Sequence, residues 1–365
     1  MKKLLIYLGH PAHFHLYKNA IANWQEKGHK VIILIKKKDV LENLLQAAGL
    51  DYINILKEGR KDSFAGMFLG MAKRTVRILN YCRKNKPDIL TGTSVENSFV
   101  GKILHIPVVN INEDDAAVVP LYAKLSYPYA DAILNPRVCN SGKWDKKAIK
   151  YESYQKLAYL HPNHFTPDRS VVEKYFSVEN PYFIIRFAKL NAHHDNGMRG
   201  ISTPVAEKLI AILKKYGNIY ISSERELEPQ FEKYRLNINP LDIHHIMAFA
   251  ALYLGDSQSM SVEAAMLGVP SVRFNDFADK IGVLEELEYT YNLTFGIKSS
   301  EPQKLYQTVE NLLNTKNLRE VFQIRRQRML ADKIDVTAFL TWFIENYPES
   351  KRIMRENPDY QYNFK

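Results

Sequence analysis

Residues 251–274 read ALYLGDSQSMSVEAAMLGVPSVRF, and this stretch decides the fold class. The apolar run Ala251–Leu254 predicts a buried strand, which a polar Asp-Ser-Gln-Ser turn follows. A helix is expected over Met260–Leu267 because Gly268 ends it, and the apolar run Ser271–Phe274 predicts the next strand. A strand, a crossover helix and a second strand form the repeating unit of a parallel sheet, so the stretch indicates an α/β fold.

The same alternation continues in both directions along the chain. In the first half we expect strands at Lys3–Leu8, Val31–Ile35, Tyr52–Leu56, Ile89–Leu90, Val108–Ile111 and Ala132–Leu134, with helices at His15–Lys27, Asp39–Ala48 and Ser63–Lys84. In the second half we expect strands at Tyr182–Arg186 and Asn218–Ser222, with helices at Pro204–Lys215 and Ile243–Ala250. The chain therefore contains one α/β half followed by another.

A break in the pattern separates the two halves. Leu160–Asp168 contains two prolines and no periodicity, which predicts a linker. We expect Rossmann-like domains at residues 1–162 and 170–330. The chain reads as helical from about residue 301 to Tyr347, and the polar tail beyond Pro348 is expected to be irregular.

Composition excludes several classes of protein. The 365 residues are too many for one ordinary core, and 46% hydrophobic with 25% charged residues is typical of a globular chain. Two cysteines without a C-x-x-C pair give neither a zinc site nor a disulfide framework. No run of about 20 apolar residues predicts a membrane span, and the net charge of +10 comes without a nucleic-acid-binding motif. We expect a cytoplasmic protein that binds no nucleic acid and no metal.

The turn after Leu254 is a candidate phosphate site. The first turn of a helix presents backbone N–H groups and a positive dipole end, and small hydroxyl residues let an anion approach. Glu263 lies about one turn further on, where a carboxylate can accept hydrogen bonds from a ribose. An ordinary strand–helix–strand unit, with Ser257 or Ser259 as the N-cap, remains the alternative. The candidate substrate-binding residues here are Asp256, Ser257, Gln258, Ser259, Met260, Ser261 and Glu263.

Two resemblances bear on these residues. The first rests on Pro240-Leu241-Asp242, Asp256-Ser257, Glu263, Gly268 and Pro270. In this order, these residues resemble the UDP-binding stretch of non-hydrolysing UDP-N-acetylglucosamine 2-epimerases. They also resemble the donor-site helix of GT-B glycosyltransferases. The motif's two glycines are replaced here by Gln258 and Ser259. The G-H-P-A-H start at 9–13 and the L-H-P-x-x-F-x-P-D run at 160–168 resemble the domain-of-unknown-function family number 354.

The resemblance implies a GT-B-like fold, in which two Rossmann-like domains face each other across a cleft. The first domain would take the acceptor, and the second would take a nucleotide-sugar, which is a substrate and not a cofactor. A C-terminal helix within residues 335–365 is then expected to cross back to the first domain. Leu241 of the Pro240–Asp242 turn joins the candidate substrate-binding residues. The H-R-x-E-N loop of the epimerases is not reproduced here, and position alone makes Arg186 and His193 candidates for the pyrophosphate and Ser222 a candidate for the base or ribose.

Two polar loops in the first half contain the candidate catalytic residues. His10, His13 and His15 follow the first strand, at the edge where open α/β sheets bind ligands. The resemblance implies that His13 deprotonates an acceptor hydroxyl, with His10 as the second choice. An N-cap, a packed loop histidine and a metal site are the alternatives.

The second loop, Asn112–Asp115, follows the strand Val108–Ile111. Glu113 matches the position of a proton-transferring glutamate in the epimerases. The aspartate of their G-D-T motif is replaced by Thr93, which counts against epimerisation. A solvated acidic loop is the alternative to a functional one.

The helix expected at 63–84 has an apolar stripe and five basic residues. Such a helix can lie on the inner face of a membrane, or it can pack its stripe on its own sheet. The stripe consists of Phe64, Met67, Phe68, Met71, Ile78, Leu79 and Cys82.

Three functions remain open. The first is a metal-independent, inverting glycosyltransferase that moves a sugar, UDP-linked by expectation, to a saccharide or lipid-linked acceptor in surface polysaccharide synthesis. The second is an epimerase or hydrolase acting on the same nucleotide-sugar. The third is a non-catalytic protein that binds a sugar-nucleotide.

Overall fold

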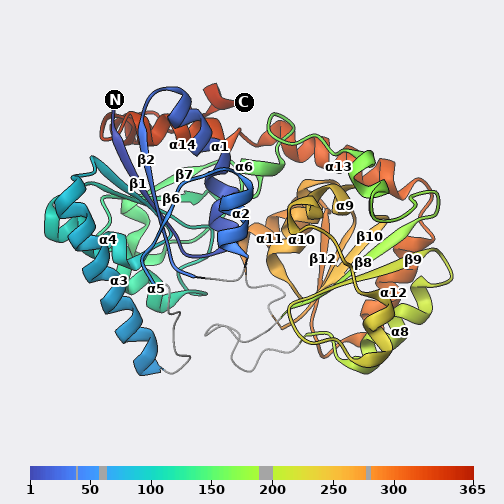
Figure 1. Ribbon diagram of the computed structural model, residues 1–365. Coiled ribbons are helices and arrows are strands. Elements are labelled where there is room, and N and C mark those ends of the chain that lie inside the picture. The colour runs from blue at the N-terminus through green and yellow to red at the C-terminus, as the bar shows by residue number, and fades with distance from the viewer. Residues whose placement is uncertain (38–39, 57–63, 189–199, 277–280) are drawn as a thin grey trace. The chain divides into compact units, whose positions relative to one another are not determined.

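The structure is a computed structural model that describes residues 1–37, 40–56, 64–188, 200–276 and 281–365 (Figure 1). The chain forms two compact units. Unit 1 contains Met1–Tyr159 and Lys333–Lys365, and unit 2 contains Leu160–Asp332. Among the described residues, no helix is long and apolar enough to cross a membrane.

Unit 1 is built on a parallel sheet with the strand order β3-β2-β1-β4-β5-β6-β7. The strands are β1 (Lys3–Leu8), β2 (Lys30–Ile35), β3 (Ile53–Asn54), β4 (Ile89–Gly92), β5 (Val108–Ile111), β6 (Ala132–Pro136) and β7 (Ala148–Tyr151). The helices between them are α1 (Pro11–Glu26), α2 (Leu41–Ala47), α3 (Phe64–Asn85), α4 (Val95–Leu104) and α5 (Pro120–Ser126), and a 3-10 helix, Gly142–Lys147, precedes β7. The prediction missed β7, α4 and α5.

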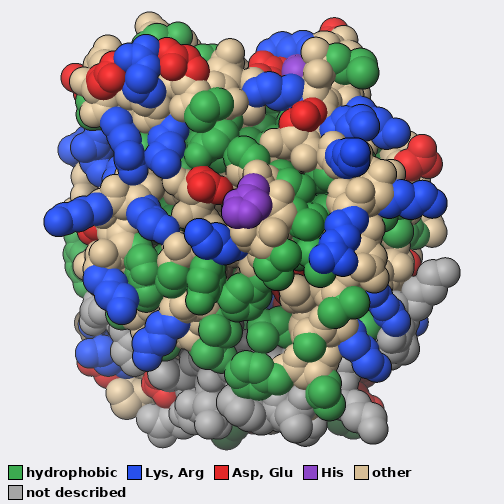
Figure 2. Space-filling view, turned by 90° about the vertical axis from the view of Figure 1, so that its left-hand side faces the viewer, with side chains coloured by type: hydrophobic (Ala, Val, Ile, Leu, Met, Phe, Trp, Pro, Cys, Tyr) green, Lys and Arg blue, Asp and Glu red, His purple; other side chains and the backbone are tan. Residues whose placement is uncertain are grey.

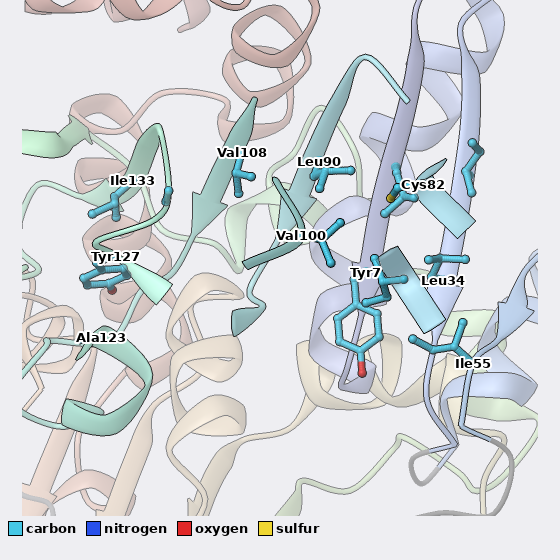
Figure 3. Close-up of a cluster of buried hydrophobic side chains, with 14 of the residues drawn as sticks. Tyr7, Leu34, Ile55, Cys82, Leu90, Val100, Val108, Ala123, Tyr127 and Ile133 are labelled. Atoms are coloured by element: carbon cyan, nitrogen blue, oxygen red, sulfur yellow. The ribbon is translucent and has the colours of Figure 1, made fainter. Parts of the chain in front are cut away.

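A hydrophobic core lies between this sheet and its helices (Figure 3). Leu34, Leu90 and Val108 come from the strands, while Val100 and Cys82 come from α4 and α3. Because parallel strands are covered on both faces, they consist of nearly continuous apolar residues. This is why the periodicity of the sequence located most of them.

The start of α1 differs from the prediction. The helix begins at Pro11 and not at His15, because His10 is its N-cap and accepts a hydrogen bond from Ala12 N. Proline is favourable in the first turn, where its missing N–H would have no partner within the helix. His15 therefore lies inside the helix, where its ring packs on Tyr159 with 5.1 Å between centroids.

The C-terminal segment belongs to unit 1, and Figure 1 shows α14 beside α1. It contains α14 (Val336–Glu345), α15 (Glu349–Glu356) and a 3-10 helix, Pro358–Phe364. The buried Trp24 donates from Nε1 to Thr341 O at 3.3 Å. The predicted irregular tail is wrong, because its aromatic rings pack on α14, with Tyr360 stacked on Trp342 at 4.8 Å.

Unit 2 has a five-stranded parallel sheet with the order β12-β11-β10-β8-β9. Its strands are β8 (Tyr182–Phe187), β9 (Asn218–Ser223), β10 (Leu252–Gly255), β11 (Ser271–Phe274) and β12 (Thr294–Ile297). Its helices are α7 (Arg169–Glu173), α8 (Thr203–Leu213), α9 (Ile243–Phe249), α10 (Gln258–Met266), α11 (Gly282–Glu285), α12 (Pro302–Leu313) and α13 (Leu318–Asp332). The short helix α6 (Leu157–Leu160) contains the boundary, since Leu160 is the first residue of unit 2. The prediction missed β12, a four-residue strand that contains Gly296.

Candidate functional site

The first turn of α10 follows directly on β10, as the sequence predicted. Ser257 is the N-cap, and its Oγ accepts from Met260 N at 3.5 Å. The Ser261 hydroxyl donates back to Ser257 O at 2.8 Å. Ser259 is exposed and Met260 is half-buried. The hydroxyl groups of Ser257 and Ser261 therefore stabilise this turn by hydrogen bonds to its backbone. The turn follows β10, so its backbone N–H groups lie at the carboxyl edge of the sheet.

Three buried polar atoms near this turn have no hydrogen-bond partner in the described structure. They are Tyr253 Oη, Arg186 Nε and Gln258 Oε1. Tyr253 is fully buried, and its Oη would lie 2.6 Å from a Cβ atom added at Gly255. Burial raises the pKa of Tyr253, so the hydroxyl keeps its proton and can donate. Native proteins leave few such atoms unpaired, since each costs about 1–3 kcal/mol, and their grouping here indicates a binding site.

Arg186 is held at the end of β8. Its Nη1 donates to Ser222 Oγ at 2.6 Å, and its Nη2 pairs with Glu224. The structure thus brings the predicted Arg186 and Ser222 together, and Glu224 from the same strand end pairs with the second Nη group. A guanidinium fixed on two sides can present its remaining Nε–H to an anion at little conformational cost.

Asp256 has a structural role that sequence reasoning missed. Its Oδ1 accepts from Ala188 N at 2.6 Å, and its Oδ2 accepts from Ile201 N at 3.2 Å. A Cβ at Gly200 would lie 2.3 Å from Oδ2, so only glycine fits there. Both carboxyl oxygens of Asp256 therefore accept backbone hydrogen bonds, one from the residue after β8 and one from a residue shortly before α8. This argues against the predicted contact of this side chain with substrate.

Burial raises the pKa of Asp256 from 3.8 to about 6. A raised pKa in the folded state means that this carboxyl stabilises the fold fully below pH ~4 and loses that contribution as the pH rises through about 6. The stability advantage of the wild type over Asp256→Asn should then shrink by up to about 3 kcal/mol from pH ~4 to pH ~7. Urea unfolding at a series of pH values measures this difference, and a constant difference would contradict the raised pKa.

Glu263 lies in the second turn of α10 and is 9% exposed. Its Oε1 is 3.4 Å from Nε2 of His244, a buried residue of α9. The Pro240–Asp242 turn precedes α9, and there Leu241 N donates to Asn239 Oδ1 at 3.1 Å. The Asp242 carboxylate accepts a hydrogen bond from Tyr175 Oη at 2.6 Å. His244 is thus a further candidate beside Glu263, and His193 lies outside the described residues.

In unit 1, the hydrogen bonds of His10 and His13 define their tautomers. Gly9 N donates to His13 Nδ1 at 3.2 Å, and Ala12 N donates to His10 Nδ1 at 3.2 Å. A backbone N–H can only donate, so both Nδ1 atoms are unprotonated and each neutral ring has its proton on Nε2. A ring in this form donates a hydrogen bond from Nε2 and cannot accept a proton there. The predicted role of general base would require the other tautomer, in which Nδ1 gives up its hydrogen bond from the backbone.

The surroundings keep His13 neutral. Burial, followed by the charges of His10, Lys36 and Lys156, lowers its pKa to about 3. Lys36 Cε and His13 Cε1 would lie 3.7 and 4.0 Å from a Cβ added at Gly9, so both side chains border this glycine. The edge next to β1 combines a neutral donor with positive charge, which suits an anionic group better than proton abstraction.

Nuclear magnetic resonance can check this assignment. We expect the ¹⁵N shifts of the His13 ring to show a neutral, Nε2-protonated imidazole throughout the range from pH 8 to pH 4, because its pKa is about 3. His13→Gln identifies the signals by their loss. Protonation of His13 with a midpoint near 6.5 would contradict the assignment.

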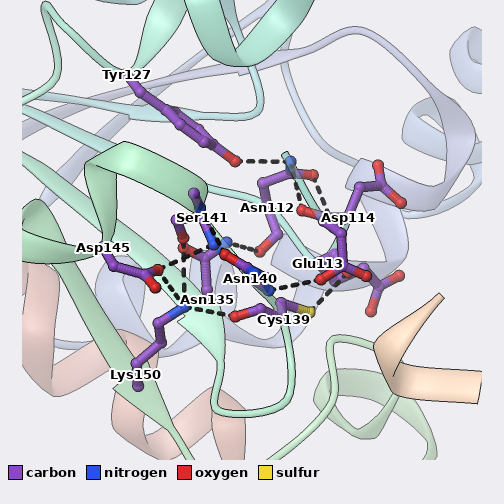
Figure 4. A network of polar contacts seen from close by, with 12 residues as sticks. Asn112, Glu113, Asp114, Tyr127, Asn135, Cys139, Asn140, Ser141, Asp145 and Lys150 are labelled. Atoms are coloured by element: carbon purple, nitrogen blue, oxygen red, sulfur yellow. Dashed lines mark hydrogen bonds and ion pairs between the residues drawn. The ribbon is translucent and has the colours of Figure 1, made fainter. Parts of the chain in front are cut away.

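Glu113 lies in a polar network after β5 and β6, most of which Figure 4 shows. Its carboxylate pairs with Lys156 and accepts from Gln155 N at 3.3 Å. Its backbone carbonyl accepts from Cys139 Sγ at 2.9 Å, and burial raises the pKa of that thiol so that it stays protonated. Asp115 accepts from Asn140 N at 2.5 Å. The acidic loop is therefore held in place, and Glu113, Asp114 and Asp115 are all half-buried.

Thr93 is the residue that the resemblance matches to an aspartate of the epimerases. Its Oγ1 donates to Ile111 O at 2.5 Å, so this hydroxyl is used in holding β4 next to β5. Among the described residues no group of three His, Cys, Asp or Glu side chains could hold a metal ion.

Solved structures with a similar fold include UDP-GlcNAc 2-epimerases and glycosyltransferases. The UDP-GlcNAc 2-epimerase of Neisseria meningitidis, bound to UDP-GlcNAc, is 16% identical with a TM-score of 0.67, over 94% of this chain and 100% of that one. The MnaA–UDP co-structure of S. aureus is 13% identical with a TM-score of 0.63, over 88% and 91%. The spinosyn rhamnosyltransferase SpnG, complexed with spinosyn aglycone, is 14% identical with a TM-score of 0.59, over 95% and 100%.

These likenesses, at low identity, show a GT-B fold. A search of curated protein sequences found no match. The model of the family described as "Protein of unknown function (DUF354)" matches residues 2–340, and the chain therefore belongs to that family.

Proposed function

We propose that the chain is a glycosyltransferase, in which unit 2 binds a nucleotide-sugar, UDP-linked by expectation, and unit 1 binds a saccharide or lipid-linked acceptor of surface polysaccharide synthesis. The observation that carries this proposal is the group of unpartnered polar atoms at the first turn of α10: Tyr253 Oη, Arg186 Nε and Gln258 Oε1. The likeness of the fold to proteins described with UDP or UDP-GlcNAc supports the same ligand class.

The donor's diphosphate would lie at the first turn of α10. Its oxygens would accept from the backbone N–H groups of that turn and from Arg186 Nε, while Tyr253 Oη donates beside them. Glu263, next to His244, would accept from the ribose hydroxyls. These groups hold negative charge without a metal ion, because the helix dipole and the guanidinium supply the positive charge.

The reaction would be a direct displacement with inversion. The acceptor oxygen bonds to the anomeric carbon, and the bond from that carbon to the phosphate oxygen breaks, its electron pair leaving with the diphosphate. The hydroxyl proton passes to Glu113, since His13 and His10 have their protons on Nε2. His13 would instead donate from Nε2 to an oxygen of the acceptor.

Epimerisation is the second candidate, because several structural neighbours are epimerases. It needs proton chemistry at the sugar without an acceptor. Thr93 provides no carboxylate at the matching position, and its hydroxyl donates to Ile111 O. This observation favours transfer over epimerisation.

A thermal-shift screen with UDP, GDP, CDP and TDP tests the donor site. A ligand at about 100 times its dissociation constant stabilises the folded protein by about 2.7 kcal/mol. We expect a shift with one nucleotide, a smaller one for Glu263→Ala, and a full one for the control Glu310→Ala, which removes an exposed carboxylate of α12.

The outcomes separate the three functions. No shift with any nucleotide would contradict the donor site. Binding followed by turnover of a UDP-sugar without acceptor would favour the epimerase or hydrolase. Binding of a nucleotide-sugar without turnover, even when saccharide and lipid-linked acceptors are added, would favour the non-catalytic protein.

A further inference from the structure

One side of unit 1 exposes apolar and basic residues together. We call it the α3–α5 face, and it consists of the exposed residues of α3, α4, α5 and the turn after α5. Five of the twelve exposed large hydrophobic residues of the described chain lie on it: Leu69, Val76, Ile103, Leu121 and Tyr129. Tyr129 packs against Phe99 of α4 with 5.1 Å between ring centroids, which joins that turn to α4.

The exposed charges of the three helices on this face have one sign, while the turn after α5 contains the exposed Asp131, whose Oδ2 accepts from Val108 N at 2.9 Å. The exposed basic residues of the helices are Lys73, Arg77, Arg83, Lys84, Lys102 and Lys124. Within α3, α4 and α5 the only carboxylate is Glu96, which is 5% exposed and pairs with the buried Arg74 at 2.6 Å. Figure 2 shows this side of the molecule, with lysine and arginine side chains around hydrophobic ones.

The face differs from the stripe that the sequence suggested. Ile78 and Cys82 of that stripe are buried in the core of unit 1, and Leu79 packs against it. The side chains of Phe64 and Met67 lie outside the described ones. Ile78, Leu79 and Cys82 therefore pack on their own sheet, as the alternative expectation stated, and other residues form the exposed surface.

We propose that the α3–α5 face docks on an anionic lipid bilayer. Lysines are depleted from protein–protein interfaces, yet here they alternate with single apolar side chains. Lysine and arginine suit a bilayer surface, because their aliphatic stems cover apolar groups while their charges reach the phosphates. The inference does not depend on the donor site in unit 2, although it fits a lipid-linked acceptor.

Co-sedimentation with vesicles tests the proposal on the full chain. The vesicles consist of phosphatidylcholine alone or mixed with phosphatidylglycerol. The test variant, Lys73→Glu/Lys102→Glu/Lys124→Glu, changes one exposed lysine on each helix. The control variant, Lys215→Glu/Lys304→Glu/Lys316→Glu, makes the same change of net charge on exposed lysines of unit 2.

We expect the wild type to bind the anionic vesicles and to lose binding as salt is added. The test variant should partition at least about tenfold more weakly, while the control variant stays within about twofold. Ile103→Ser/Leu121→Ser should weaken the binding that remains at high salt, because it removes apolar contacts but no charge.

Two results would overturn the proposal. One is a wild type that stays in the supernatant with anionic vesicles, which would leave a protein partner as the occupant of this face. The other is an equal loss in the test and control variants, which would reflect net charge alone. Nucleotide binding by the test variant, measured in parallel, should equal that of the wild type, so failure here is distinguishable from failure of the proposed function.

Discussion

Replacing Phe339 with alanine should destabilise unit 1 by about 3–5 kcal/mol, the usual cost of removing a fully buried phenylalanine. Phe339 is 0% exposed. Its ring lies 5.7 Å from Tyr151 on β7, 5.8 Å from Phe343 and 5.8 Å from Phe364 in the terminal 3-10 helix. Alanine would leave a cavity where the C-terminal segment contacts the sheet. Domains are stable by only about 5–15 kcal/mol, so this loss is large.

Tryptophan fluorescence during urea unfolding measures the change. The three tryptophans, Trp24, Trp144 and Trp342, all lie in unit 1, so their signal reports on that unit. The control is Tyr362→Ala in the terminal 3-10 helix. The Tyr362 side chain is 39% exposed, so its removal should change the free energy of unfolding by less than about 1 kcal/mol. Equal, small effects of both substitutions would mean that the C-terminal segment is not part of the fold of unit 1.

Replacing Arg186 with alanine should weaken binding of the nucleotide found in the screen by about 10- to 150-fold. Hydrogen bonds to charged groups contribute about 1.5–3 kcal/mol, and every 1.4 kcal/mol is a factor of ten. The Arg186 side chain is 15% exposed and is already oriented by Ser222 and Glu224, so little entropy is lost when an anion binds. Calorimetric titration gives the dissociation constants.

Two variants control this result. Arg235→Ala removes a half-buried arginine of unit 2 that pairs with Glu232 three residues before it, and it should leave nucleotide affinity unchanged. Arg186→Lys keeps the charge but loses the planar fork, so its affinity should fall between those of the wild type and Arg186→Ala. Unchanged affinity in Arg186→Ala would contradict the proposed position of the diphosphate.

The segment from β10 to β11 shows which features the local sequence predicts well. The turn at Ser257, the glycine that ends α10 and the apolar strands on either side act over a few residues, and the structure has each of them in place. The same holds for most strands of both sheets, because a strand buried on both faces must be apolar throughout.

The roles of individual side chains depended on neighbours distant in sequence. The Asp256 carboxyl group accepts hydrogen bonds from Ala188 N and Ile201 N, which are 68 and 55 residues away in the sequence. The Glu113 carboxylate is paired because β7 brings Lys156 to it from 43 residues away. No local pattern specifies such pairs.

By itself, the sequence determined the class of fold, the two α/β halves and the residues at the first turn of α10, since strand burial and helix capping depend on short-range chemistry. Only the tertiary structure decided which polar atoms lack partners, that Gly9 N donates to His13 Nδ1, and that the C-terminal rings pack on α14. Burial and pairing are properties of the whole packed unit, and they arise only when segments distant along the chain come together.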